Sequence, residues 1–553
     1  MKLMGAEILV ECLKEQGVST VFGYPGGTVL DIYDALYRDG AIEHVITSHE
    51  QGAAHAADGW ARVTGKTGVV IATSGPGATN LVTGIATAYM DSIPMVAITG
   101  NVGANFLGRD SFQEIDIFGI TLPITKHNYI VKDVKELAGV VREAFAIAGS
   151  GRKGPVLIDI LKNVQSETAE YEPQKPVPLH AKAVPARMLE DAAKAIAAAE
   201  RPLIMVGGGA IASEASREVR ALAERLDAPV VSTLMGLGAF PASHPLFMGM
   251  MGMHGTATAA KLCLESDCIL AIGTRFSDRV ALNRDKFAAG KTVVQIDIDN
   301  AELDKNVAVT HAVLGDVKEA LATLVPMLPE QKQRAFAARA KELKAAERAA
   351  QKQPELGHRI LIEAAKLAPK DAIVVTDVGQ HQMWTAQYYP VERPRTFCTS
   401  GGLGTMGYGL GAAIGAAKAS GKHVILVTGD GCFNMNLNEL STAVTQGLPI
   451  TILLMNNHAL GMVRQWQKLF YGRRFSQTDV RKKTDYVKFA ESFGAKGLFI
   501  ERAEDVDGVL KEAFATPSPV VVDCRIGSDE NVLPMIKPGQ TYDTIMTEWE
   551  DKA

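Results

Sequence analysis

The segment 423–457 constrains the fold of this chain more than any other. It contains an apolar run, the turn Gly429-Asp430-Gly431, a stretch of helical periodicity, and a second apolar run that ends at Asn456-Asn457. This order predicts a strand, a crossover helix and a parallel strand. Because neighbouring parallel strands end on the same edge of a sheet, we expect Asp430 and Asn457 to lie side by side there, where open α/β sheets bind ligands.

The two side chains at these strand ends suit a cation. Asp430 and Asn457 offer a carboxylate and an amide oxygen, and the flanking glycines let backbone come close, which fits Mg²⁺ that keeps phosphate oxygens as its other ligands. A Gly-Asp-Gly turn alone is usually an ordinary helix N-cap. The Asn-Asn pair at the next strand end makes the pattern resemble the thiamine diphosphate (ThDP) motif. That resemblance implies metal ligation by Asp430, Asn457 and the backbone carbonyl of Ala459.

Length and composition bound the organisation of the chain. Because 553 residues are too many for one core, we expect three domains, at 1–165, 186–330 and 358–553. The small net charge of −5 gives no general attraction to nucleic acid or to an anionic membrane, and no apolar run is long enough to span a bilayer. The six cysteines form no CxxC pair, which is typical of buried thiols in a reducing cytoplasm. We therefore expect a cytoplasmic protein.

The alternation of strand and helix patterns predicts an α/β fold with three doubly wound parallel-sheet domains. The segment 74–100 repeats the plan of segment 423–457, so the first and third domains are expected to be related folds. The middle domain is expected to be a Rossmann-like nucleotide-binding domain, because a predicted strand runs into Gly207-Gly208-Gly209. The next strand ends in Ser232-Thr233 without an acid for an NAD ribose. A nicotinamide dehydrogenase is therefore disfavoured, although another nucleotide remains possible. The stretch 331–358, rich in Ala, Lys, Glu and Arg, is expected to be a solvated helix that joins two domains.

Nine short motifs along the chain resemble, in matching order, the catalytic subunits of the acetohydroxyacid synthase (acetolactate synthase) family. These are YPGG (24–27), SHEQGA (48–53), SGPGATN (74–80), FQE (112–114), ITKHNY (124–129), GMHGT (252–256), GQHQMW (379–384), GGLGTMG (401–407) and GMVRQWQ (461–467). The resemblance implies ThDP-dependent decarboxylation of pyruvate and addition of the two-carbon unit to a second 2-ketoacid. The product would be 2-acetolactate with pyruvate, or 2-aceto-2-hydroxybutyrate with 2-ketobutyrate, in branched-chain amino acid biosynthesis.

The resemblance also assigns roles around ThDP. Glu50 would be the proton-relay carboxylate, and Met406 the bulky residue that bends the cofactor. Gly26, Gly27 and Gln113 would lie near the reacting centre. Residues that would contact ThDP are Glu50, Gly379, Gln380, His381, Gly404, Met406, Gly429, Asp430, Gly431, Asn457 and Met462.

The second substrate is assigned to a helix that follows Asn457. Met462, Trp466 and Phe470 recur four residues apart, and by spacing alone such a stripe usually belongs to a core. By resemblance, Trp466 and Met462 instead shape the second-substrate pocket. Arg275 would receive the substrate carboxylate, because a guanidinium can bond a carboxylate through two parallel contacts.

The family also carries FAD in the middle domain. Matching positions are Arg152, Gly207, Gly208, Gly209, Gly252, His254, Arg275, Asp297 and Asp316. This chain departs from the family pattern at Ser277, where an Asp is usual, and at 102–105, where the loop is usually VPRR. These departures leave open a flavin-free catabolic acetolactate synthase, or another ThDP-dependent 2-ketoacid carboligase or decarboxylase. A ThDP fold that only binds ligand is disfavoured by the presence of Glu50, Asp430 and Asn457.

Quaternary structure is likewise an expectation from resemblance. In this superfamily, the glutamate and the metal ligands of one active site come from different subunits. A homodimer or homotetramer is therefore expected, and a separate regulatory small subunit is possible.

Overall fold

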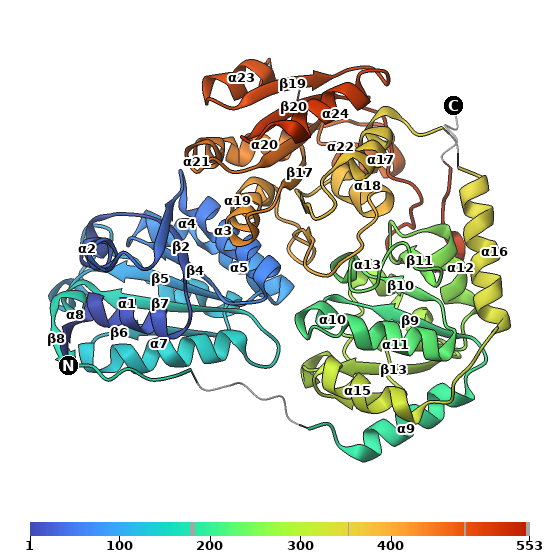
Figure 1. Ribbon diagram of the computed structural model, residues 1–553, viewed down its shortest axis with the longest axis horizontal. Helices are drawn as coiled ribbons and strands as arrows, with labels where there is room; N and C mark the ends of the chain where they lie inside the picture. Colours follow the sequence, from blue (N-terminus) through green and yellow to red (C-terminus); the bar gives the residue numbers. More distant parts are fainter. Residues whose placement is uncertain (177–182, 352, 481–482, 549–553) are drawn as a thin grey trace.

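The computed structural model describes residues 1–176, 183–351, 353–480 and 483–548 (Figure 1). The chain forms three six-stranded sheets and a small antiparallel pair, β1 (Lys2–Met4) with β8 (Thr168–Glu170). Every pairing within the three large sheets is parallel. The predicted fold class is therefore confirmed. The predicted domain limits stay a prediction, and residues 177–182, between the first two predicted domains, lie outside the described residues.

The first and third sheets have the same topology. The first has the order β3-β2-β4-β5-β7-β6 and the third β16-β15-β17-β18-β20-β19, so that within each sheet the strand order, counted along the chain, is 2-1-3-4-6-5. The predicted relation between these two domains agrees with this order. Strand bounds in the first sheet are β2 Thr20–Tyr24, β3 Glu43–Ile46, β4 Gly68–Ala72, β5 Met95–Asn101, β6 His127–Val131 and β7 Pro155–Leu161; in the third they are β15 Ile373–Thr376, β16 Phe397–Cys398, β17 Val424–Gly429, β18 Ile450–Asn456, β19 Lys496–Ile500 and β20 Val520–Arg525.

The middle sheet has the order β11-β10-β9-β12-β13-β14, which is the 3-2-1-4-5-6 order typical of a Rossmann domain. Its direction of winding reverses between β9 and β12, next to the Gly207–Gly209 turn. Its strands are β9 Pro202–Val206, β10 Val230–Ser232, β11 Phe247–Met250, β12 Cys268–Ile272, β13 Thr292–Asp297 and β14 His311–Leu314.

Helices cover both faces of these sheets (Figure 1). The longer ones are α1 Gly5–Glu15, α2 Leu30–Asp39, α3 Glu50–Thr64, α5 Val82–Asp91, α7 Val134–Gly149, α9 Ala186–Ala198, α11 Ser216–Leu226, α12 Ala257–Glu265, α15 Val317–Met327, α16 Ala335–Ala349, α17 Leu356–Leu367, α18 Gln380–Tyr388, α19 Tyr408–Ser420, α22 Gly461–Phe470 and α24 Val506–Ala515; shorter ones are α20 Asp430–Asn436, α21 Leu440–Thr445 and α23 Tyr486–Ser492. Within the described part of the chain, none is long and apolar enough to cross a membrane.

Helix α16 corrects one expectation. It was predicted to be solvated, but Phe336, Ala340 and Leu343 are buried against the core of the middle domain. Their spacing of four and three places them on one face of the helix, and the many alanines and charges of the segment obscure this pattern in the sequence. The carboxylate of Glu347 also accepts hydrogen bonds from the backbone of Ala257 and Thr258, at the start of α12.

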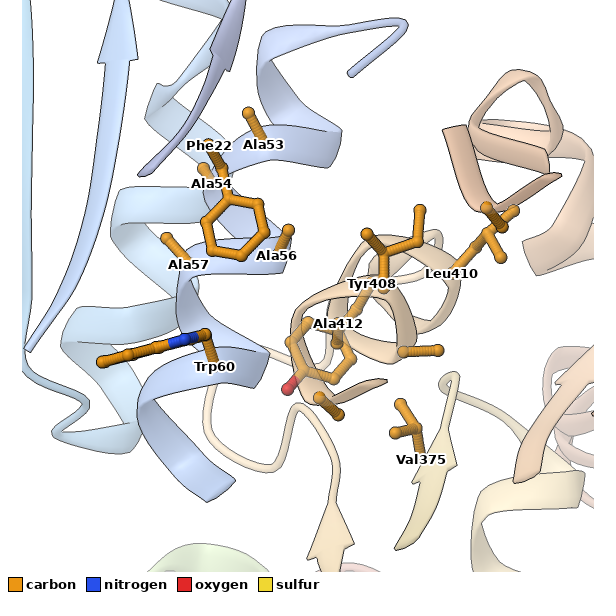
Figure 2. Close-up of a cluster of buried hydrophobic side chains, with 14 of the residues drawn as sticks. Phe22, Ala53, Ala54, Ala56, Ala57, Trp60, Val375, Tyr408, Leu410 and Ala412 are labelled. Atoms are coloured by element: carbon orange, nitrogen blue, oxygen red, sulfur yellow. The ribbon is translucent and has the colours of Figure 1, made fainter. Parts of the chain in front are cut away.

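Helices α3 and α19 join the first and third domains through backbone contact. Figure 2 shows the small side chain of Ala56 on the side of α3 that lies toward Tyr408 and Ala412 of α19. A Cβ atom added to Gly415 would lie 1.8 Å from the carbonyl oxygen of Ala56, so a larger residue would force the helices apart.

A buried ionic network reinforces this helix crossing. Arg62 of α3 bonds Asp58 at 2.6 Å and Asp91 at 2.8 Å, and the hydroxyl of Tyr408 donates to Asp58 at 2.8 Å. Asp91 in turn accepts the backbone N–H groups of Gly401 and Gly402. Asp58 and its neighbours raise the pKa of the Arg62 guanidinium well above its ordinary value despite burial, so Arg62 stays charged.

We predict that Gly415→Ala destabilises the protein by about 1–3 kcal/mol, because it overpacks the α3–α19 contact. Gly139→Ala is the matched control, since Gly139 also lies inside a helix but has open space around its added Cβ. It should stabilise by about 0.5–1 kcal/mol through helix propensity alone. Thermal unfolding of both variants measures the difference, and equal shifts in Tm would contradict the packing argument.

Candidate active site

A cavity of about 60 Å³ opens at the carboxyl edge of the third sheet, where its strand order reverses between β15 and β17. This is the position at which open α/β sheets bind ligands. Residues that line the cavity and were predicted to contact ThDP are Gly379, Gln380, His381, Met406, Gly429, Asp430, Gly431, Asn457 and Met462; Ala459, predicted as a metal ligand, also lines it, and the other lining residues include Trp384, Cys432 and Leu460. The structure therefore gathers into one cavity the third-domain residues that the sequence assigned to the cofactor, except Gly404.

The backbone around this cavity is suited to an anion. Helices α18 and α22 begin at Gln380 and Gly461, so both N-termini lie at the cavity wall, where unpaired N–H groups and the helix dipole favour phosphate. Gly429 lets the His381 ring come close, because an added Cβ would lie 3.0 Å from its Nδ1. Burial lowers the pKa of His381 to about 3, so its ring is neutral at pH 7, and its buried Nε2 has no partner among the described residues. These features fit a diphosphate that lies across the two helix ends.

The predicted metal ligands are close together. Strands β17 and β18 pair in parallel with Gly429 opposite Met455, so that Asp430 and Asn457 follow neighbouring strand ends and line the same cavity with Ala459. Within the described ranges, no group of three or more His, Cys, Asp or Glu side chains could hold a metal. A cation bound by one carboxylate, one amide and one carbonyl therefore needs further oxygens, which a diphosphate would supply.

The loop that carries Met406 is held from two sides. Asp377, at the end of β15, accepts the N–H of Gly407 at 2.8 Å and the hydroxyl of Thr428 at 3.1 Å. Burial raises the pKa of Asp377 to about 6. On the other side, Asp91 of the first domain accepts two N–H groups of the same loop. Met406 is thus fixed at the cavity wall by the α3–α19 crossing region.

Glu50 lies in a second group of predicted residues, at the carboxyl edge of the first sheet. It begins α3 and is buried, and its Oε2 accepts a hydrogen bond from Asn80 at 2.9 Å. A Cβ on Gly77 would come within 3.2 Å of Oε1, so this glycine makes room for the carboxylate. Nearby, an added Cβ on Gly26 would meet the Thr73 side chain, which follows β4. Gln113 adopts a positive φ of 59° against Gly75.

Glu439 is a residue that the sequence analysis missed. It is fully buried, its two oxygens accept the N–H of Ser48 at 3.2 and 3.1 Å, and Thr442 donates to it at 2.7 Å. Glu439 thereby fixes the turn that precedes Glu50 from the third domain. Burial raises the pKa of Glu439. Its only sequence signal is its place nine residues after Asp430 in the helical stretch, which does not reveal the contact with Ser48.

The two groups of residues do not meet within one chain. No described residue from the first domain lines the Asp430 cavity. A separate hollow of about 310 Å³ lies in the first domain and includes Gly27, Thr28, Phe112 and Lys162. Phe112 is 87% exposed there.

Helix α22 shows that the stripe of Met462, Trp466 and Phe470 is not an ordinary core stripe. The buried residue of this helix is Gln465, and Trp466 is only partly buried against the middle domain. The guanidinium of Arg279 lies 5.9 Å from the Trp466 ring and 3.7 Å from the sulfur of Met253. The structure thus adds Arg279 to Arg275 as a candidate for the substrate carboxylate. Sequence alone could not choose between two arginines four residues apart.

The predicted FAD residues other than Arg152 lie at or just after the carboxyl ends of strands of the middle sheet. Gly207 and Gly209 pack against the Gly273 turn of β12, since an added Cβ on either would lie within 3 Å of that backbone. His254 is buried, burial lowers its pKa to about 4, and its Nδ1 has no partner among the described residues. Burial raises the pKa of Asp297 to about 6.

Arg152 and Asp316 already have protein partners. Arg152 bonds Ser92, Asp299 and Glu302, and so bridges the first and middle domains. Asp316 caps α15 and accepts a hydrogen bond from Ser213. Arg275, which shares its loop with Arg279, holds Asn306 through its backbone carbonyl, and Gly252 has a positive φ of 124°.

Comparisons with known proteins agree with this geometry. Three family models match: the thiamine pyrophosphate enzyme N-terminal TPP binding domain at residues 3–120, the central domain at 189–324, and the C-terminal TPP binding domain at 377–524. The chain is 46% identical to an acetolactate synthase large subunit of Mycobacterium tuberculosis over 98% of this chain and 91% of that protein. It is 42% identical to the acetolactate synthase large subunit of Haemophilus influenzae, over 100% of both chains, and 46% identical to that of Corynebacterium glutamicum, over 98% of this chain and 90% of that protein.

Two findings support the same family: the sequence identity extends over nearly the whole chain, and the third-domain cavity has the arrangement described above. The chain therefore belongs to the acetolactate synthase family of thiamine pyrophosphate enzymes.

Proposed function

We propose that this protein decarboxylates pyruvate and transfers the two-carbon unit to a second 2-ketoacid, forming 2-acetolactate or 2-aceto-2-hydroxybutyrate. The observation that carries the proposal is the cavity in which Asp430, Asn457 and Ala459 meet the N-termini of α18 and α22. Bound ThDP would supply the nucleophilic carbon that attacks the keto group.

Each residue group has a task in this proposal. Asp430, Asn457 and the Ala459 carbonyl would hold Mg²⁺, and the two helix N-termini would orient the diphosphate. Met406 would pack against the bound cofactor, while Glu50 would hold and return a proton at the aminopyrimidine ring. Trp466 and Met462 shape the second-substrate pocket beside the middle domain.

A homodimer reconciles the two separated residue groups. Glu50 with Gly26, Gly27 and Gln113 lies on the first domain, whereas the metal ligands line a cavity formed by the third domain alone among the described residues. The exposed Phe112 and the hollow beside Gly27 would then face the Asp430 cavity of a second copy. The relatives named large subunits also suggest a separate small subunit as a partner of this chain.

FAD is proposed as a bound group of the middle domain. The supporting observations are the Rossmann strand order, the glycine turn at its switch point, and the unpartnered Nδ1 of buried His254. The residues that would contact it are those predicted by resemblance, with Arg152 available only if it leaves Asp299 and Glu302.

The central test is the reaction itself. Purified protein with pyruvate, ThDP and Mg²⁺ should form acetolactate, detected as acetoin after acid treatment. Glu50→Gln should lower turnover by about 10²–10⁴-fold, because proton transfer needs the carboxylate. Glu7→Gln, a matched change in the first turn of α1, should leave turnover unchanged. Acetaldehyde as the main product would instead indicate a decarboxylase, and near-normal turnover of Glu50→Gln would remove Glu50 from its role.

The two arginines can be separated by kinetics. We predict that Arg279→Gln raises the KM for the second 2-ketoacid at least tenfold if Arg279 receives the carboxylate, because a charge-assisted hydrogen bond contributes about 1.5–3 kcal/mol. Arg275→Gln is the matched control. A larger effect at Arg275 would restore the assignment made from resemblance.

Trp466→Leu should change the choice between substrates. One methylene in an apolar pocket is worth about 1–3 kcal/mol, so loss of the indole should lower the preference for 2-ketobutyrate over pyruvate. The ratio of the two products from a mixture of both acids measures this preference. An unchanged ratio would mean that Trp466 only packs against the middle domain.

The flavin proposal has a direct readout. The purified protein should be yellow, and its flavin should pass a filter only after denaturation, because the group is held without a covalent bond. A colourless protein that still forms acetolactate would contradict FAD binding and favour a flavin-free synthase.

A further inference from the structure

Helix α22 buries a glutamine where an amphipathic helix would ordinarily bury an apolar side chain. Gln465 is 2% exposed, and its amide pairs with both backbone groups of Val532, which lies in the C-terminal tail after β20. Its Oε1 accepts the Val532 N–H at 2.8 Å, and its Nε2 donates to the Val532 carbonyl at 3.1 Å. Because a backbone N–H can only donate and a carbonyl can only accept, this pairing fixes which end of the Gln465 amide is oxygen.

The fixed polarity continues into a second amide. Gln380 donates through Nε2 to Oε1 of Gln465 at 3.1 Å and to the backbone carbonyl of Glu530 at 2.7 Å. Both acceptors hold the nitrogen end of Gln380 toward the tail. Its Oε1 must therefore point the opposite way, where it accepts Nδ2 of Asn457 at 3.2 Å.

The third amide is the predicted metal ligand. The nitrogen end of Asn457 is committed to Gln380, so Oδ1 is the end left to bind a cation, and its other lone pair accepts the N–H of Ala459 at 3.0 Å. Gly461 permits this approach, since an added Cβ would lie 1.9 Å from Oε1 of Gln380 and 2.6 Å from Nδ2 of Asn457. An amide with free rotation would offer nitrogen and oxygen to the cation equally, and the nitrogen end repels it.

We propose that Gln465 is a positioning residue which, through Gln380, orients the Asn457 amide so that its oxygen faces the metal. This inference rests on the proposed metal site, and it adds an explanation of which end of the Asn457 amide faces the metal there. The tail that sets this polarity also binds the middle domain, through the Ile536 N–H to the Met253 carbonyl at 2.9 Å and the Tyr542 hydroxyl to the Val280 carbonyl at 2.5 Å. Docking of the tail on the Arg279 loop and orientation of the metal ligand are therefore linked.

The test is Mn²⁺ binding to the full-length protein with ThDP, followed by electron paramagnetic resonance and without turnover. Gln465→Leu should weaken Mn²⁺ about tenfold, because partners that orient metal ligands typically contribute 10–100-fold in affinity. Gln467→Leu is the matched control on the same helix. Its amide bonds Ser476 and Thr478 and does not contact Gln380, so Mn²⁺ affinity should be unchanged.

A double-mutant cycle separates orientation from general structural damage. In an Asn457→Asp background the ligand has oxygen at both ends and needs no orientation, so Gln465→Leu should cause no further loss of Mn²⁺ affinity. The proposal would be overturned if Gln465→Leu lowered Mn²⁺ affinity equally in both backgrounds. It would also be overturned if Gln465→Leu did not lower Mn²⁺ affinity in the protein that retains Asn457. Gln465→Met replaces the leucine variant if the latter fails to fold by circular dichroism. If the unsubstituted protein with ThDP binds no Mn²⁺, the proposed metal site itself is wrong. If the unsubstituted protein binds Mn²⁺ and the Gln465→Leu variant binds it equally well, the metal site stands and only the positioning role of Gln465 is wrong.

Discussion

The contact between α3 and α19 is the constraint on which the rest of the molecule depends. These helices touch through backbone, because Gly59 and Gly415 each leave no room for a side chain against Ala412 and Ala56. The crossing places Glu50 at one end of α3 and the Met406 loop at the start of α19. The buried Arg62 network then ties the Met406 loop to the first domain, so the two domains that carry the chemistry hold a fixed relation within one chain.

The candidate sites of all three domains lie where the strand order of a sheet reverses. Each large sheet has a reversal of strand order next to its first strand, and a glycine turn lies beside each of these reversals: Gly26-Gly27 in the first, Gly207–Gly209 in the middle and Gly429–Gly431 in the third. The loops at such a point diverge and leave a crevice at the carboxyl ends of the strands. The first and third copies are specialised differently, one offering a carboxylate at a helix start and the other metal ligands and helix N-termini.

The sequence could predict features that depend on strand ends and local periodicity. Asp430 and Asn457 follow directly from two parallel strands joined by one helix, and the doubly wound sheets follow from the alternation of elements. The sequence could not predict contacts between distant segments, such as Glu439 with the Ser48 turn or Arg279 with Trp466. Such contacts produce no periodic pattern in the sequence. Helix α16 was misjudged because the many alanines and charges around Phe336 and Leu343 obscure its apolar face. The burial of Gln465 could not be predicted for a related reason. A polar residue is stable at a buried helical position only when partners satisfy its amide, and here those partners are Val532 and Gln380, which are distant in the sequence.

The central claim is that Glu50 and Asp430 act together only across two copies of the chain. Co-expression of Glu50→Gln with Asp430→Asn tests this most directly, because each variant alone should be inactive. If the site lies between two subunits, a mixed dimer has one intact site, and random pairing should restore about a quarter of the unsubstituted turnover. If both residues serve a site within one chain, no combination contains an intact site, and activity at the background of the single variants would contradict the account.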